Sequence, residues 1–364
     1  MRNTRIRIFI NVLILLSIGI IMIYSASCIY AQEKYHDGMF FLKKQIIFVL
    51  LGLISMFSVM SFDYHLLKDK AKILVMISWL LLILVLVPFI GREIAGARRW
   101  FRFGFLSFQP SEFSYIALIV YVASFISQKN TLIKESFLKG FLPVLFVSGI
   151  TSILILLQPD LGTVFAINAV VLIMLFIAGV PKRSIIFIFL VSLALLFVLI
   201  STSTYRRNRL TAFLNPWQDP KGKGYQIVQS NIALGCGGIL GRGLGNSYQK
   251  LFYLPAAHTD FIFSIIGEEL GLLGTLSVCL LFINLMLEGL KISKYSPDTF
   301  GTYLSLGIIF VLSLKAVINI GVACGVLPTK GLPLPFISYG GSSLIFDLVG
   351  IGLVLNVSRF SEKE

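Results

Sequence analysis

The chain has 364 residues, of which 57% are hydrophobic, and its mean hydropathy is +0.90. This apolar share exceeds that of a soluble globular domain, so composition excludes an ordinary soluble enzyme. The formal net charge is +14, but no basic region has the aromatic or helical context of a nucleic-acid-binding module. We therefore expect a membrane protein with no nucleic-acid partner.

Apolar segments of membrane-spanning length recur along the chain. The first follows three arginines, but it is too long for a signal-peptide core and lacks a good cleavage site, so we expect a retained helix. A helical bundle satisfies every backbone group inside the bilayer, which predicts one all-α polytopic membrane domain over residues 1–364. About ten transmembrane helices are expected, at roughly Ile8 to Tyr30, Lys44 to Met60, Ile73 to Ile90, Ser111 to Ser127, Phe141 to Leu157, Leu161 to Gly179, Ile185 to Ser201, Phe261 to Leu287, Thr302 to Cys324 and Ser338 to Val357.

Basic residues predict the orientation of these helices. If the N-terminus is cytoplasmic, every cytoplasmic segment is basic, from Arg2, Arg5 and Arg7 at the start to Arg359 and Lys363 at the end. We therefore expect both termini in the cytoplasm.

Two loops on the predicted outer side are also basic. One spans residues 91–109, and the other is a large loop, residues 202–258, between the seventh and eighth helices. A long loop can be translocated whatever its charge, but the arginines also suit an anionic group. Short amphipathic helices on the membrane are expected within residues 213–258. The glycines of residues 235–245 fit neither a dinucleotide nor a Walker sequence, and predict tight turns or close helix packing.

The segment before the eighth span ends in Ala257-His258-Thr259-Asp260-Phe261. A carboxylate at a membrane boundary needs a partner or a task. Thr259 or Asp260 could cap the following helix, and chemistry at Asp260 is the alternative.

Polar groups also occur inside the apolar spans. Lys315 lies near the middle of the ninth span, where a lysine costs about 2.5 to 3.5 kcal/mol on insertion scales. It should face a carboxylate or a wet cavity, and the candidate partners are Asp160, Glu112 and Glu268. A structural ion pair and direct substrate contact both remain open.

Six motifs, in this order along the chain, resemble the SEDS family of shape, elongation, division and sporulation proteins. Residues 249–255 are more similar to the division branch, FtsW, than to the elongation branch, RodA. The motifs are Gly96-Ala97-Arg98-Arg99-Trp100, Gln109-Pro110-Ser111-Glu112, Gln158-Pro159-Asp160-Leu161-Gly162-Thr163, Asn215-Pro216-Trp217, His258-Thr259-Asp260-Phe261 and residues 331–343, GLPLPFISYGGSS.

The resemblance implies a peptidoglycan glycosyltransferase that polymerises lipid II at the outer face of the cytoplasmic membrane. The family's catalytic aspartate falls on Asp260, which would act as the base for the attacking sugar hydroxyl. Arginine forks suit the pyrophosphate of the leaving group. The expected substrate-binding residues are Arg98, Arg99, Trp100, Gln109, Glu112, Asp160, Arg207, Arg209, Lys315 and Ser338.

The resemblance also implies the surroundings in which the chain works. We expect a class B penicillin-binding protein, which is a transpeptidase, as partner, together with other divisome proteins, in the bacterial cytoplasmic membrane at the division septum. No tightly bound cofactor is expected, although a divalent cation, Mg²⁺ or Mn²⁺, could assist. The three histidines and four cysteines have no metal-ligand or disulfide spacing, so no protein-built metal site is expected.

One residue departs from the family pattern. The family usually has a lysine three residues after the glutamate that matches Glu112, and here Tyr115 stands there. We hypothesise that Lys315 supplies the missing positive charge.

Two other functions fit a ten-helix bundle with buried charges. One is a flippase that translocates lipid II, although convincing internal repeats, common in transporters, are absent. The other is a non-catalytic divisome scaffold. Only a polymerase needs the carboxylate of Asp260 for bond formation.

Overall fold

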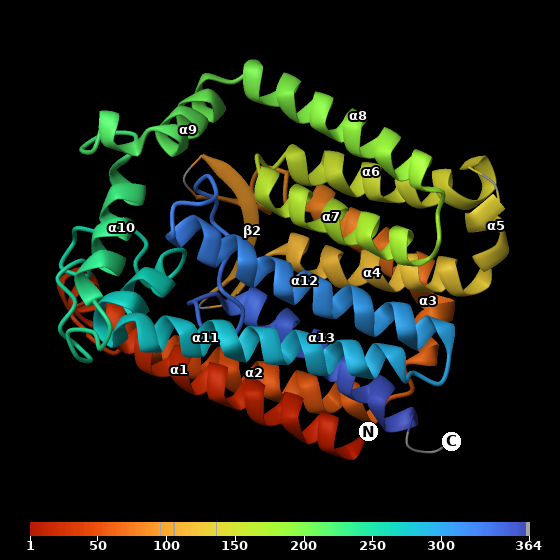
Figure 1. Ribbon diagram of the computed structural model, residues 1–364, viewed down its shortest axis with the longest axis horizontal. Helices are drawn as coiled ribbons and strands as arrows, with labels where there is room; N and C mark the ends of the chain where they lie inside the picture. The colour runs from red at the N-terminus through yellow and green to blue at the C-terminus, as the bar shows by residue number, and fades with distance from the viewer. Residues whose placement is uncertain (95, 105, 136, 362–364) are drawn as a thin grey trace.

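The computed structural model describes residues 1–94, 96–104, 106–135 and 137–361. Long helices lie side by side in one bundle, and both termini lie at the same end of it (Figure 1). The helices are α1 (Arg2–Tyr35), α2 (Phe40–Ser61), α3 (His65–Leu84), α4 (Pro110–Gln128), α5 (Asn130–Glu135), the π-helix η1 (Phe137–Phe141), α6 (Leu142–Leu156), α7 (Leu161–Ile177), α8 (Lys182–Ser201), α9 (Thr204–Leu214), the 3₁₀-helix η2 (Pro216–Gln218), α10 (Tyr225–Gly237), α11 (Ile262–Lys294), α12 (Thr299–Ala323) and α13 (Gly341–Phe360).

Each of the ten predicted spans falls largely within one of these helices. Within the described residues, seven helical stretches are long and apolar enough to cross a membrane, and α7 is a shorter apolar helix. The structure thus confirms a helical, multi-pass membrane protein. The count of ten crossings and the cytoplasmic position of the termini stay predictions.

The centre of the bundle is formed by α12 and α13. Helix α12 packs against α4, α7, α11 and α13, and α13 packs against α2. Glycines allow the close approach, because a Cβ at Gly352 would stand 2.7 Å from the Met56 carbonyl oxygen of α2. Small residues at such interfaces are typical of membrane helices. Helix α8 lies at the edge of the bundle (Figure 1), and its contacts are mainly with α7 and α9.

A small antiparallel sheet, which the sequence did not suggest, accompanies the helical bundle. Its strands are β1 (Arg92–Ile94), β2 (Ala97–Phe103) and β3 (Leu106–Phe108), in the order β1-β2-β3. The turn at Gly96 has a φ of 75°, which suits glycine. Strand β2 is Ala-Arg-Arg-Trp-Phe-Arg-Phe, and its aromatic residues favour a strand. The sheet lies at the end of the bundle opposite the termini (Figure 1).

Helix α11 is interrupted at Gly271, where φ is 67° and ψ is −161°. The glycine-rich segment after α10 satisfies backbone groups at this break. The Arg242 N–H donates to the Glu268 carbonyl, and the Leu272 N–H donates to the Gly238 carbonyl. A Cβ at Gly237 would stand 1.8 Å from the Gly267 carbonyl oxygen. The glycines therefore serve close packing and turns, as predicted.

Residues 213–258 contain η2 and α10, so short helices are present where they were predicted, and α9 precedes them in the same loop. Their position relative to the membrane stays a prediction. They lie at the same end of the bundle as the sheet (Figure 1).

Candidate functional site

Asp260 lies immediately before α11 and does not cap it. The N-cap residue is Phe261, and no side chain bonds to the first free N–H groups. The Asp260 backbone is held instead by Asn319 of α12, whose Nδ2 donates to the Asp260 carbonyl at 2.9 Å and to the Leu332 carbonyl at 2.8 Å. The capping alternative is thus excluded, and the carboxylate is left for another task.

The Asp260 carboxylate has no hydrogen-bond donor among the described residues. It lies against Gly331, where a Cβ would stand 3.0 Å from the Asp260 Oδ2. Burial raises the pKa of Asp260 to about 6, although the positive charge of Arg209 opposes the shift. A carboxylate with a raised pKa near neutrality is suited to accept a proton.

Two cations lie in this region, Arg209 near the carboxylate of Asp260 and Lys330 near Arg209. Arg209 of α9 donates from Nη1 to the Thr329 carbonyl at 3.1 Å, which ties α9 to the segment between α12 and α13. Lys330 follows Thr329 in the chain. Burial and the positive charge of Arg209 both lower the pKa of Lys330, and the negative charge of Asp160 opposes this shift. Sequence reasoning missed Lys330; the signal was a lysine within an apolar, proline-rich stretch next to a family motif.

Asp160 is the second carboxylate of the site. It caps α7, because its carboxylate accepts from the Thr163 backbone N–H at 3.2 Å and from the Thr163 hydroxyl at 2.9 Å. Arg99 of β2 lies 3.8 Å from Asp160 and donates to the carbonyls of Gln158 and Pro159. Asp260, Asp160 and the cations Arg99, Arg209 and Lys330 therefore belong to one region of the bundle.

An aromatic cluster supports the segment that carries Asp260. The His258 ring lies 4.5 Å from the Phe41 ring, 5.8 Å from Tyr30 and 5.9 Å from Tyr339, between centroids. Burial lowers the pKa of His258 to about 4, so the imidazole is neutral at neutral pH. The neutral ring is suited to packing and leaves Asp260 as the titrating group of this motif.

Ser338 braces the same segment. Its hydroxyl donates to the Thr259 carbonyl at 2.6 Å and accepts from the Leu334 N–H at 2.9 Å. Both contacts are within the protein, so this predicted substrate-binding residue lies where it positions the neighbour of Asp260.

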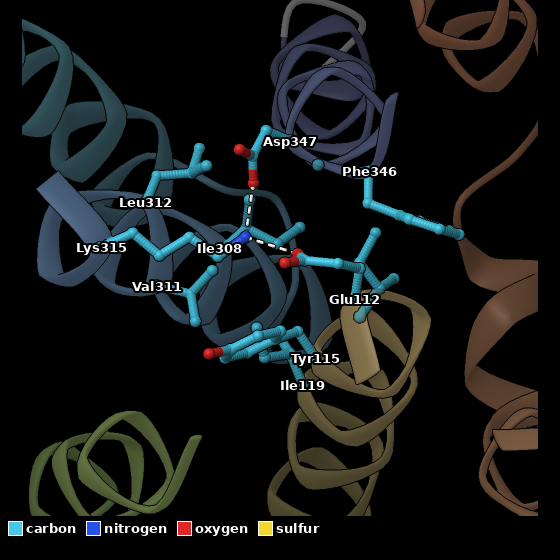
Figure 2. Close-up of a pocket in the computed structure, with 11 residues that line it drawn as sticks. Glu112, Tyr115, Ile119, Ile308, Val311, Leu312, Lys315, Phe346 and Asp347 are labelled. Atoms are coloured by element: carbon cyan, nitrogen blue, oxygen red, sulfur yellow. Dashed lines mark hydrogen bonds and ion pairs between the residues drawn. The ribbon is translucent and has the colours of Figure 1, made fainter. Parts of the chain in front are cut away.

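A buried ion cluster lies within the bundle (Figure 2). Lys315 of α12 donates to Glu112 of α4 at 2.7 Å and to Asp347 of α13 at 2.8 Å. Its Nζ also lies 4.9 Å from the centre of the Tyr115 ring. A cavity of about 10 Å³ borders the cluster, which is room for about one water molecule. Lys315 therefore pairs with Glu112, as anticipated, and with Asp347, which the sequence did not suggest.

Glu268 was the third candidate partner of Lys315, and that pairing is wrong. Glu268 accepts from Arg242 and from the backbone N–H of Tyr248. The adjacent Glu269 pairs with Lys250 at 2.8 Å and accepts from the Ser25 hydroxyl of α1. Both carboxylates therefore find their partners among residues 242–250.

The other predicted residues occupy separate places. Arg98 pairs with Glu93 at 3.3 Å, and Arg207 makes a long contact of 3.5 Å with Thr204. Gln109 precedes α4, and its backbone N–H donates to the Ser342 hydroxyl. Trp100 lies on β2 opposite Arg92. None of these side chains is joined to Asp260 by a described contact.

The chain resembles known proteins over nearly its whole length. A family described as cell cycle protein, whose model covers FtsW, RodA and SpoVE, matches residues 6–363. Stage V sporulation protein E of Bacillus subtilis is 44% identical over 349 residues, which is 96% of this chain and 95% of that protein. A probable peptidoglycan glycosyltransferase FtsW of Geobacter sp. strain M18 is 45% identical over 345 residues, or 95% and 94% of the two chains.

Solved structures share the fold. A chain from a peptidoglycan synthase complex, described as coordinating polymerization and crosslinking, aligns with a TM-score of 0.79 and 33% identity over 98% of both chains. The rod shape determining protein RodA of Thermus thermophilus aligns with a TM-score of 0.73 and 28% identity, covering 98% of this chain and 97% of that one.

Proposed function

This chain belongs to the SEDS family of cell cycle proteins, and from that premise we propose that it is a peptidoglycan glycosyltransferase, which polymerises lipid II at the outer face of the cytoplasmic membrane. Relatives named as such glycosyltransferases support the proposal. The observation that carries it is the carboxylate of Asp260, which has no hydrogen-bond donor among the described residues and a pKa raised to about 6.

The proposed reaction needs a base and a means of stabilising the leaving group. Asp260 removes the proton from the attacking sugar hydroxyl as the anomeric carbon loses its bond to the lipid pyrophosphate. Arg209 lies near enough to Asp260 for their charges to interact. Lys330 lies near enough to Arg209 for the same to hold between those two cations. Cations at this point stabilise the negative charge that grows on the departing pyrophosphate.

A divalent cation is also part of the proposal. Carboxylate and phosphate oxygens are the ligands that Mg²⁺ prefers. Of the two aspartates of the site, Asp160 accepts hydrogen bonds from Thr163, whereas the Asp260 carboxylate has no hydrogen-bond donor among the described residues. The ion would supply further positive charge beside the pyrophosphate.

The proposed partner is a class B penicillin-binding protein, a transpeptidase. Support comes from the 33% identical chain that was solved within a peptidoglycan synthase complex. Action at the division septum with other divisome proteins is part of the proposal, and the FtsW relatives support it. The equally similar sporulation relative raises sporulation as a second setting.

The test uses purified chain, with and without the transpeptidase, and labelled lipid II. Wild-type protein should form glycan polymer on a gel, and Asp260→Asn should lose about 10² to 10⁴ in rate while its melting temperature stays unchanged. Equal polymer from both proteins would remove Asp260 as the base. If no polymer forms in any combination, translocation of lipid II in sealed vesicles separates a flippase from a scaffold.

A further inference from the structure

The small sheet divides the basic residues of the 91–109 loop between two faces. Successive side chains of a strand point to opposite faces, so Arg99 lies on one face of β2 and Trp100 and Arg102 lie on the other. Arg99 reaches Gln158, Pro159 and Asp160. Arg92 lies directly opposite Trp100, and directly opposed residues share a face. Arg92 and Arg102 are therefore on the face turned away from Asp160.

These two arginines line a cavity of about 700 Å³ together with Phe89, Ile90 and Glu93. Within the described part of the chain, no carboxylate pairs with Arg92 or Arg102. Glu93 faces Arg98 at 3.3 Å, so its charge is already engaged. Lys44 of α2 lies near enough to Arg102 for the two like charges to repel each other. The cavity therefore has an excess of positive charge.

An exposed apolar edge adjoins this charge. Phe89 and Ile90 are 106% and 49% exposed, and they follow the C-terminal end of α3. Aromatic and aliphatic side chains beside guanidinium groups are typical of a protein surface at the boundary between acyl chains and head groups. Guanidinium forks match phosphate oxygens.

We propose that the cavity lined by Arg92, Arg102 and Phe89 binds the phosphate head group of a membrane lipid, as a second anion site on the face of β2 opposite to Arg99. The lipid is either an anionic phospholipid or the pyrophosphate carrier of a glycan strand. The second source rests on the proposed function, since a polymerase that joins two lipid-linked molecules must hold two pyrophosphates at once.

Native mass spectrometry of the full chain in detergent tests the proposal, because it counts bound lipids. The probes are dioleoylphosphatidylglycerol, undecaprenyl pyrophosphate and, as the phosphate-free reference, dioleoylglycerol. Arg92→Gln/Arg102→Gln should weaken the affinity of the cavity for a phosphate lipid about 10- to 30-fold. At a lipid concentration that fills the site in wild type, the variant should therefore carry one phosphate lipid fewer. The matched control is Lys43→Gln/Lys221→Gln, which removes two positive charges outside the cavity and should bind as wild type does.

Each outcome decides a point. Retention of the lipid by Arg92→Gln/Arg102→Gln, an equal loss in the control, or equal binding of dioleoylglycerol by wild type would overturn the proposal. Tighter binding of phosphatidylglycerol identifies a phospholipid site, and tighter binding of undecaprenyl pyrophosphate identifies a carrier site. The single variant Arg102→Gln, with about a fivefold loss expected, repeats the test if the double variant melts early. Lipid binding is counted without turnover, so failure of polymerisation leaves this readout intact.

Discussion

Gly331 lies against the side chain of Asp260, so close that a Cβ at residue 331 would stand 3.0 Å from the Asp260 Oδ2. This glycine belongs to the segment between α12 and α13, and Asp260 precedes α11. The contact therefore joins two parts of the chain that are far apart in sequence. It also limits the directions in which the carboxylate can turn.

Gly331→Ala should lower polymerisation about 10- to 100-fold, because a displaced catalytic group loses its alignment with the substrate. Gly340→Ala is the matched control, since its Cβ would meet nothing closer than 3.6 Å. Glycan yield on a gel and melting temperature check both variants. Equal activity of the two alanine variants would contradict the importance of this contact.

The rate of polymerisation should depend on the ionisation of Asp260. A base must be deprotonated, so activity should be half-maximal near the pKa of about 6, nearly full above about pH 7, and should fall about tenfold per pH unit well below the pKa. His258, whose pKa is lowered to about 4, stays neutral over most of that range. Initial rates from pH 4.5 to 8 measure the profile, and an acid limb with its midpoint near 4 would assign the essential group elsewhere.

Lys315→Met should destabilise the protein by about 3 to 5 kcal/mol, because it leaves Glu112 and Asp347 as buried, uncompensated acids. The Lys315 ammonium lies beside the Tyr115 ring, so Tyr115→Lys/Lys315→Met should restore much of the stability by returning the charge to α4. Lys43→Met, which breaks an exposed pair with Asp37, should change stability by about 0 to 1 kcal/mol.

Thermal unfolding of these variants, followed by polymerisation of lipid II, checks the hypothesis that Lys315 replaces the usual family lysine. A Lys315→Met protein with unchanged folding and activity would count against it. So would a Tyr115→Lys/Lys315→Met protein no better than Lys315→Met alone.

Gly271→Ala should destabilise α11 by more than the about 1 to 3 kcal/mol of a strained backbone alone. Its φ is 67°, and the new Cβ would stand 2.3 Å from the Gly241 nitrogen. Gly235→Ala in α10 is the comparison, because a Cβ there meets nothing within 4 Å and alanine favours a helix. Melting temperatures should fall for the first variant only.

Removal of divalent cations tests the proposed helper ion. EDTA should suppress polymerisation by wild type, and added Mg²⁺ or Mn²⁺ should restore it, because the ion screens the pyrophosphate charge. Binding of lipid II, measured in parallel, separates an effect on chemistry from one on affinity. Unchanged rates in EDTA would assign all the charge stabilisation to side chains such as Arg209 and Lys330.

Some features of this protein follow from local patterns alone. The apolar runs predicted the helices because a membrane segment must satisfy its backbone groups internally, and each predicted span falls largely within one helix. The glycines of residues 235–245 predicted close packing because only they lack a Cβ. Asp260 was identified by its place at the lip of a span and by a family motif around it.

Tertiary structure decided which charges meet. Lys315 had three candidate partners in sequence, and the packing of α4, α12 and α13 selected Glu112 and added Asp347. Glu268 was excluded because it pairs with Arg242, which the fold of the glycine-rich segment brings to it. Lys330 was missed because only the return of the chain between α12 and α13 brings it near Arg209 and Asp160. Electrostatic partners depend on distance through space, and sequence spacing specifies that distance only within a single helix or strand.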